Sequence, residues 1–165
     1  MLWRKIEKIP FKNVKSCLNQ VKKKSIVSPW IEDIFSNKLN LKYEKYKNFE
    51  IHKLTLKEIG FKKATKLKNV YKKFKILKFD LVPPEISIFL RLIYLRQPRG
   101  EWLRISVPFN SMIDSDKVPH LPKLGRALGK NFLETYWSYP EAIFHPHNDF
   151  LVAKFNDRKK DKVKK

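Results

Sequence analysis

The excess of positive charge limits this chain most strongly. Lysine and arginine number 37, aspartate and glutamate number 16, and the formal net charge is +21. A compact fold with this charge repels itself unless an anionic partner lies against it. An AT-rich genome would also raise the lysine content, but the same codon bias supplies acidic residues and does not explain a basic-to-acidic ratio above two. We therefore expect a polyanionic partner.

Several classes of protein are excluded by composition. A hydrophobic content of 42% with 13% aromatic residues allows a packed core and excludes a disordered chain. The longest apolar stretch, residues 88–95, is interrupted by Arg91 and is much shorter than the roughly 20 residues that cross a bilayer. The single Cys17 can form neither an internal disulfide nor a thiolate zinc site. The N-terminus lacks the apolar segment of a secretory signal.

Hydrophobic periodicity divides the chain into helices and strands. The sequence predicts helices over residues 10–24, 28–35, 55–74 and 122–132, and strands over residues 48–54, 77–81, 86–96, 102–107 and 150–155. The strands at 86–96 and 102–107 are expected to form a hairpin through the turn at residues 97–100. This order predicts a two-layer α+β fold with a mainly antiparallel sheet and packed helices, and the split βαβ arrangement is one variant of it.

Three segments are expected along the chain. They are a basic helical N-terminal extension over residues 1–47, an α+β core domain over residues 48–155, and a basic C-terminal tail over residues 156–165. Residues 1–80 hold 22 basic and 7 acidic side chains, so the charge is concentrated in the N-terminal half. The extension and the tail are expected to lie outside the core.

A cationic helix face is the strongest functional feature. The helix predicted over residues 55–74 places most of its apolar side chains in one arc, and Lys62, Lys66, Lys72 and Lys73 outside that arc. Lysines along one face can neutralise successive phosphates and release their counterions, and arginines fork onto phosphate or stack on bases. The residues expected to bind nucleic acid are Lys62, Lys66, Lys68, Lys72, Lys73, Arg91, Arg96, Arg99, Arg104, Arg126, Lys130, Arg158, Lys159 and Lys160. The alternative is a lysine-rich face that contacts only water.

Trp102 is a candidate for base stacking because it shares a strand face with Arg104. We favour the simpler interpretation that this tryptophan packs against its neighbours, as most aromatic side chains on strands do. The glycine and aromatic signatures of common RNA-reading modules are missing from the sequence. No base-specific recognition is therefore expected.

One cluster resembles a catalytic or metal site. His145, His147 and Asp149 lie within five residues and could hold a divalent cation that activates water in a nuclease or phosphoesterase. Further ligands would have to come from His52, His120 or scattered acids. We favour a loop of turn-forming residues here, and we expect no catalytic residue, metal or cofactor. Cys17 is expected to be a small buried hydrophobic residue.

The leading hypothesis is a non-enzymatic, RNA-binding structural protein. We expect a component of a ribosomal subunit, cytoplasmic or in a mitochondrion or other organelle, that contacts rRNA phosphates and neighbouring proteins. Two alternatives remain. One is a small metal-dependent nuclease that uses His145, His147 and Asp149, and the other is an accessory subunit of a membrane-bound complex that touches anionic lipid through its basic helix.

Overall fold

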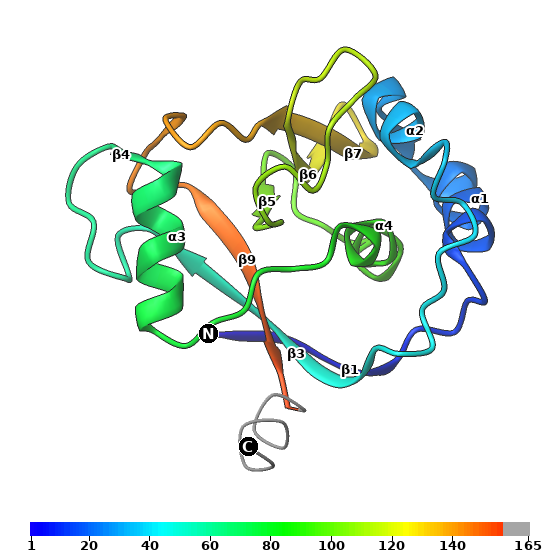
Figure 1. Cartoon of the computed structure of the whole chain (residues 1–165), viewed down its shortest axis with the longest axis horizontal. Coiled ribbons are helices and arrows are strands. Elements are labelled where there is room, and N and C mark those ends of the chain that lie inside the picture. Colours follow the sequence, from blue (N-terminus) through cyan, green and yellow to red (C-terminus); the bar gives the residue numbers. More distant parts are fainter. Residues whose placement is uncertain (157–165) are drawn as a thin grey trace.

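The computed structural model describes residues 1–156 (Figure 1). The strands are β1 (Leu2–Lys8), β2 (Ile26–Val27), β3 (Lys47–Thr55), β4 (Thr65–Lys66), β5 (Trp102–Ile105), β6 (His120–Ala127), β7 (Lys130–Trp137), β8 (Ile143–Phe144) and β9 (Asp149–Phe155). The helices are α1 (Val14–Lys24), α2 (Pro29–Phe35), α3 (Leu67–Ile76) and α4 (Pro84–Ile93).

The strands form a mixed sheet in which antiparallel pairs predominate. Its order is β1-β3-β9-β5-β6-β7-β2, and β4 and β8 form a separate two-stranded sheet. The pairs β5–β9 and β2–β7 are parallel, and the other neighbours in the large sheet are antiparallel. The expected α+β fold with a mainly antiparallel sheet is thereby confirmed.

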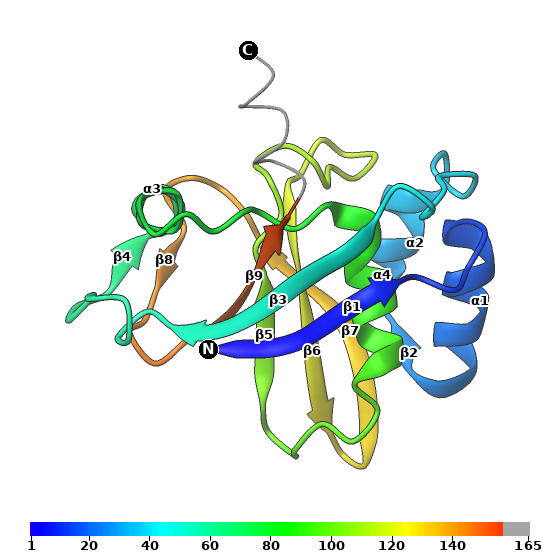
Figure 2. The ribbon, with the colours of Figure 1, turned by 90° about the horizontal axis from the view of Figure 1, so that it is seen from below.

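Helices pack on both sides of the large sheet. In Figure 2, α1, α2 and α4 lie to the right of β5, β6 and β7, whereas α3, β4 and β8 lie to the left. Every residue of α4 from Glu85 to Arg91 is buried. On the other side, Phe74 of α3 packs against Phe150 of β9 with ring centroids 6.0 Å apart. The Tyr71 hydroxyl donates a hydrogen bond to the carbonyl oxygen of Val107 at 2.6 Å.

The N-terminal segment belongs to the core, so the expectation that it lies outside is wrong. The helices expected near residues 10–24 and 28–35 do form, as α1 and α2. However, β1 pairs with β3, and Ile6 is buried in the core. Helix α1 buries Val14, Leu18 and Val21 and packs on α4. An apolar helix face needs such a partner surface, and α4 provides it.

Cys17 is buried on the same face of α1, as expected. Burial raises the pKa of its thiol to about 12, and a hydrogen bond with Tyr43 opposes this only in part. The thiolate is the reactive form of cysteine. At neutral pH this side chain is therefore unreactive.

Two predicted elements have the wrong type. Residues 86–96, expected as a strand, form most of α4, and residues 122–132, expected as a helix, lie in the hairpin of β6 and β7. The hairpin turn contains Leu128 at φ 52 and Gly129 at φ 74. Two residues at positive φ are typical of tight hairpin turns. The expected hairpin of 86–96 with 102–107 does not form, since β5 pairs with β6 and β9.

Two further elements are shorter than predicted. The amide of Glu58 does donate to Thr55 Oγ1 at 3.1 Å, but the backbone then turns at Gly60, with φ 105, and α3 begins only at Leu67. Of the strand predicted over residues 77–81, only Asp80 forms a bridge, with Ala153. The strands predicted over 48–54 and 150–155 are confirmed as β3 and β9.

Candidate nucleic-acid interface

A lysine-rich lobe, defined as residues 57–78 and 139–147, lies at one end of the molecule. It contains α3, β4 and β8 and appears on the left of Figures 1 and 2. Residues 57–78 carry nine lysines and one acid, Glu58. The two parts are joined by the β4–β8 pairing and by hydrogen bonds from the amides of Leu67 and Lys68 to the carbonyl oxygens of Ala142 and Pro140, at 2.8 and 3.0 Å.

Helix α3 turns its lysines to solvent because its other face packs on the sheet. Lys66 and Lys68 share one acid, Glu141, at 2.7 and 3.0 Å, and their hydrogen bonds hold the pKa of that carboxyl below its usual value. Lys72 and Lys75 are exposed and form no ion pair with any acid of residues 1–156. The helix therefore carries more positive charge than its neighbours neutralise.

Exposed aromatic side chains lie in this lobe and in the chain segment that leads into it. Tyr136, Trp137 and Tyr139 follow one another along the end of β7 and the segment after it, and Trp137 is 59% exposed. The next residue, Pro140, accepts the hydrogen bond from Lys68 described above. Aromatic rings interleaved with lysines are typical of surfaces that bind single-stranded nucleic acid, because bases stack on the rings while phosphates meet the cations.

The side chain of Trp102 is packed, in agreement with the favoured interpretation. Its ring lies directly on Gly125, where an added Cβ would be 2.0 Å from the ring. The Nζ of Lys123 lies over the Trp102 ring, 4.7 Å from its centroid. The Phe132 ring lies 6.4 Å away. An incoming base would have to displace one of these contacts.

Arg104 and Lys123 are like charges on directly opposed positions of β5 and β6. Burial lowers the pKa of both side chains, and Arg104 lowers that of Lys123 further. The buried Nε of Arg104 has no hydrogen-bond partner within the described residues. Asp149 and Glu134 offset this charge in part. Arg104 is thus a predicted binding residue that is half-buried and incompletely bonded.

Arg91 was expected to contact phosphate, and that prediction is wrong. Its side chain is 0% exposed. The guanidinium donates to Gln97 Oε1 at 2.8 Å, to the carbonyl oxygens of Gly125 and Phe132 at 3.1 and 3.0 Å, and to the carbonyl oxygen of Tyr94. Arg91 therefore joins α4 to the β6–β7 hairpin and cannot reach a partner.

The remaining predicted residues fall into two groups. Lys62, Lys66, Lys68, Lys72 and Lys73 lie in the lysine-rich lobe, whereas Arg96, Arg99, Arg126 and Lys130 surround the β6–β7 turn. Hydrogen bonds from Asn131 and Arg126 to the carbonyl oxygen of Leu95, at 2.9 and 3.3 Å, hold the second group together. Arg158, Lys159 and Lys160 lie outside the described residues.

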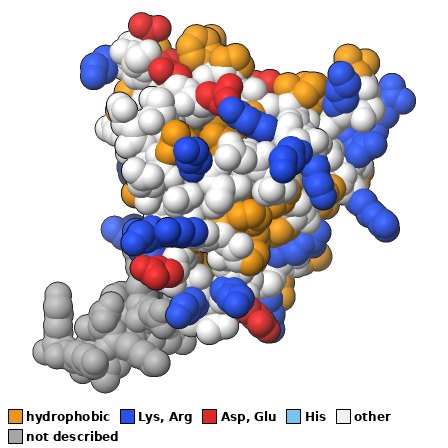
Figure 3. Space-filling view, turned by 90° about the vertical axis from the view of Figure 1, so that its right-hand side faces the viewer, with side chains coloured by type: hydrophobic (Ala, Val, Ile, Leu, Met, Phe, Trp, Pro, Cys, Tyr) orange, Lys and Arg blue, Asp and Glu red, His pale blue; other side chains and the backbone are white. Residues whose placement is uncertain are grey.

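The face that carries α1 and α2 has a different distribution of charge. Figure 3 shows lysine and arginine side chains distributed over it, among apolar side chains and several acids. On this face Lys22 forms an ion pair with Glu32. Surface lysines outside the lobe thus provide matched controls for experiments on binding.

The set His145, His147 and Asp149 is not assembled as a metal site. The two imidazole rings lie 5.1 Å apart, but Asp149 is a residue of β9, where it pairs with Thr55 and Leu103. Within residues 1–156, no group of three or more histidine, cysteine or acidic side chains could hold a metal ion. The two histidines line a pocket together with Lys57, Lys62 and Lys63.

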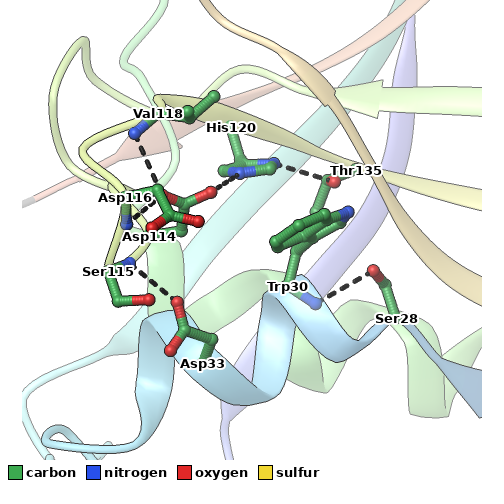
Figure 4. Close-up of polar contacts among 9 residues, drawn as sticks. All are labelled: Ser28, Trp30, Asp33, Asp114, Ser115, Asp116, Val118, His120 and Thr135. Carbon is green, nitrogen blue, oxygen red and sulfur yellow. Dashed lines mark hydrogen bonds and ion pairs between the residues drawn. The ribbon is translucent and has the colours of Figure 1, made fainter.

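A buried histidine network escaped the sequence analysis (Figure 4). His120 places Nε2 2.8 Å from Asp114 Oδ2 and Nδ1 2.9 Å from Thr135 Oγ1. Asp114 Oδ1 accepts hydrogen bonds from the amides of Asp116 and Val118 at 2.8 and 3.0 Å. Trp30 of α2 stacks on the imidazole at 5.5 Å.

This network holds the loop between β5 and β6 against α2. The amide of Ser115 adds a hydrogen bond to Asp33 Oδ2 at 2.8 Å. Both nitrogens of His120 are used within the protein, which suits a structural role and leaves none for a substrate. A spacing of six residues between Asp114 and His120 matches no common motif, so the pair can be recognised only from the three-dimensional structure.

No protein-family model, curated protein or solved structure matches this chain. The helices described in residues 1–156 are all too short or too polar to cross a membrane.

Proposed function

We propose that this protein binds RNA as a non-enzymatic structural component of a ribonucleoprotein particle, of which a ribosomal subunit is the leading candidate. The observation that carries the proposal is that the backbone of Lys68, at the lysine-bearing start of α3, is bonded to Pro140, which directly follows a segment with three exposed aromatic side chains, Tyr136, Trp137 and Tyr139. Lysines alone would suit any polyanion. Lysines beside exposed rings favour single-stranded RNA, which offers phosphates and unstacked bases together.

The net charge supports a large RNA partner over a small one. Phosphates along a folded RNA can neutralise lysines on several faces at once, and the second basic group around the β6–β7 turn gives such an RNA a further point of contact. Positive charge on more than one face is what a protein embedded in RNA requires. A membrane surface would engage only one face.

Fluorescence anisotropy with a single-stranded oligoribonucleotide tests RNA binding. We expect a dissociation constant of roughly 10⁻⁴ to 10⁻⁶ M near physiological salt, and weaker binding as salt rises. The double variant Lys72→Ala/Lys75→Ala should lower the slope of log K against log salt by about 0.7 for each lost phosphate contact. The matched control is Lys23→Ala/Lys24→Ala on α1, which removes the same charge elsewhere.

The aromatic contribution is tested separately with Trp137→Ala. Stacking on one base is worth roughly 1–3 kcal/mol, so binding of single-stranded RNA should weaken about fivefold or more, whereas binding of duplex RNA should change little. Equal losses in the α3 and α1 double variants, or binding that ignores salt, would contradict the proposal. Sedimentation of the tagged protein with ribosomal subunits in low and high salt tests the identity of the particle.

A further inference from the structure

A pocket of about 300 Å³ lies in the lysine-rich lobe, between the loop after β3 and the loop between β8 and β9. It is lined by Lys57, Phe61, Lys62, Lys63, Ala64, His145, Pro146 and His147. Pockets for small ligands measure roughly 300–1,000 Å³. The volume of this pocket lies at the lower end of that range, so its ligand should be no larger than a nucleotide. It is a separate feature from the exposed face of α3.

The lining of this pocket carries only one sign of charge. Three lysines and two histidines face it, and no acid does. Within residues 1–156, Lys57, Lys62 and Lys63 form no ion pair, whereas Lys66 and Lys68 nearby share Glu141. Three lysines around one pocket whose lining contains no acid repel one another and would be stabilised by a bound anion.

The two loops are held together by their backbones. The amide of Lys57 donates to the carbonyl oxygen of Pro146 at 2.9 Å, and that of Leu56 donates to the carbonyl oxygen of Asn148 at 3.4 Å. The side chain of Asn148 accepts from the amide of His145 at 2.7 Å. The lysine and histidine side chains therefore project from a preformed frame, which lowers the entropic cost of binding.

The chemistry of the lining identifies the ligand class. Lysine and histidine donate charge-assisted hydrogen bonds to phosphate oxygens. A phosphate monoester has three terminal oxygens and up to two negative charges. Because it is attached to the nucleoside on one side only, it can be enclosed in a pocket, whereas a backbone phosphodiester is attached to the chain on both sides. Phe61, Pro146 and Ala64 supply an apolar wall beside the cations, which suits the attached nucleoside.

We propose that this pocket binds the phosphate monoester of a nucleotide, either at an end of an RNA chain or in a free mononucleotide. This inference deepens the proposed function, since an RNA-binding protein with such a pocket would prefer phosphorylated ends. The lysines of α3 would bind the chain, and the pocket would bind its end.

Isothermal titration calorimetry tests the inference with four probes. They are one oligoribonucleotide carrying a 5′-phosphate, a 3′-phosphate or two hydroxyl ends, and a nucleoside 5′-monophosphate. We expect one phosphorylated probe to bind about tenfold more tightly than the hydroxyl-ended oligonucleotide, and which probe does so identifies the source of the phosphate. Lys62→Ala/Lys63→Ala should abolish that preference, whereas Lys72→Ala/Lys75→Ala should weaken all oligonucleotides and keep it.

The outcomes separate this inference from the proposed function. If all three oligonucleotides bind equally, the mononucleotide does not bind, and the two double variants lose affinity alike, the pocket is only part of the general surface. The inference then fails while RNA binding stands. If the mononucleotide binds in the pocket but no oligonucleotide binds, the proposed function fails instead. Circular dichroism establishes that both variants are folded, as expected for exposed positions.

Discussion

Arg91 is the clearest case in which a cation of this basic protein serves the core. Burial lowers the pKa of its guanidinium to about 10, so the group remains charged at neutral pH. No carboxylate forms an ion pair with it within the described residues, and its hydrogen bonds go to carbonyl oxygens and to Gln97. Backbone oxygens of three separate segments depend on this one side chain.

Replacement of Arg91 should therefore be costly. We expect Arg91→Met to lower the free energy of unfolding by about 3 kcal/mol or more, because buried carbonyl oxygens and Gln97 lose their donor. Urea denaturation measures the change. Arg99→Ala, at an exposed turn position, is the control and should change stability by less than about 0.5 kcal/mol. Equal effects of the two substitutions would show that Arg91 is not structural.

The Asp114 carboxylate should make the free energy of unfolding depend on pH in the acidic range. The hydrogen bond from His120 and the amides of Val118 and Asp116 hold its pKa below the ordinary value of 3.8. The ionised form is favoured by folding, so its contribution is present above about pH 4 and is lost as the pH falls through the lowered pKa. The loop between β5 and β6 should loosen in that range.

The variant Asp114→Asn tests this dependence. Its free energy of unfolding should be lower than that of the wild type at pH 7, and the difference should shrink as the pH is lowered below about 4. Urea denaturation across this pH range measures it, with the exposed Asp116→Asn as control. A difference that stays constant down to acid pH would contradict the role given to the Asp114 carboxylate.

At the scale of elements, the pairing of β5 with β6 requires a residue without a side chain, Gly125, opposite Trp102. Trp102 lies where a Cβ of Gly125 would be. Gly125→Ala should lower the free energy of unfolding by roughly 1–3 kcal/mol through overpacking. In Trp102→Leu the smaller side chain should accommodate the extra methyl group, so the double variant should be more stable than the sum of the two single effects predicts. Strict additivity in thermal or urea unfolding would rule out this contact as the cause.

Among the helices, α1 with its regular polar face was predictable, and the fully buried α4 was not. Helix α1 alternates buried and exposed positions at helical spacing and was found from the sequence. Helix α4 is buried on all sides over residues 85–91, so this stretch is mainly apolar and resembles a central strand, although Ser87 and Arg91 lie at helical spacing. Pro84 at its first turn is a signal for a helix that the run of isoleucine and leucine concealed.

The same reasoning applies to the candidate site. The lysines of α3 were predicted because a single periodic segment carries them. The pocket was not, because Lys62 and His145 come from loops far apart in the sequence that meet only through backbone hydrogen bonds. Leu124, Leu128 and Phe132 repeat every four residues, a spacing that fits a helix, but in the structure Leu124 lies on β6, Phe132 on β7 and Leu128 in the turn between them.

For the molecule as a whole, the charge of +21 should oppose folding in dilute buffer. Raising sodium chloride from low concentration to about 0.5 M screens repulsion over distances beyond a few ångströms. We expect the melting temperature to rise by several degrees, since about 1 kcal/mol corresponds to roughly 2–4 °C for a chain of this size. Differential scanning fluorimetry measures it. A melting temperature that is unchanged or falls would show that the surface charges are already compensated within the fold.

The position of β9 governs when this protein can fold during its synthesis. β9 joins β3 to β5, so the strands made before it form two separate groups, β1 with β3 and β5 with β6 and β7. Translation must pass residue 155 before those groups can be united. Until then the nascent chain exposes two unpaired strand edges, which are the positions where chaperones would protect it from aggregation.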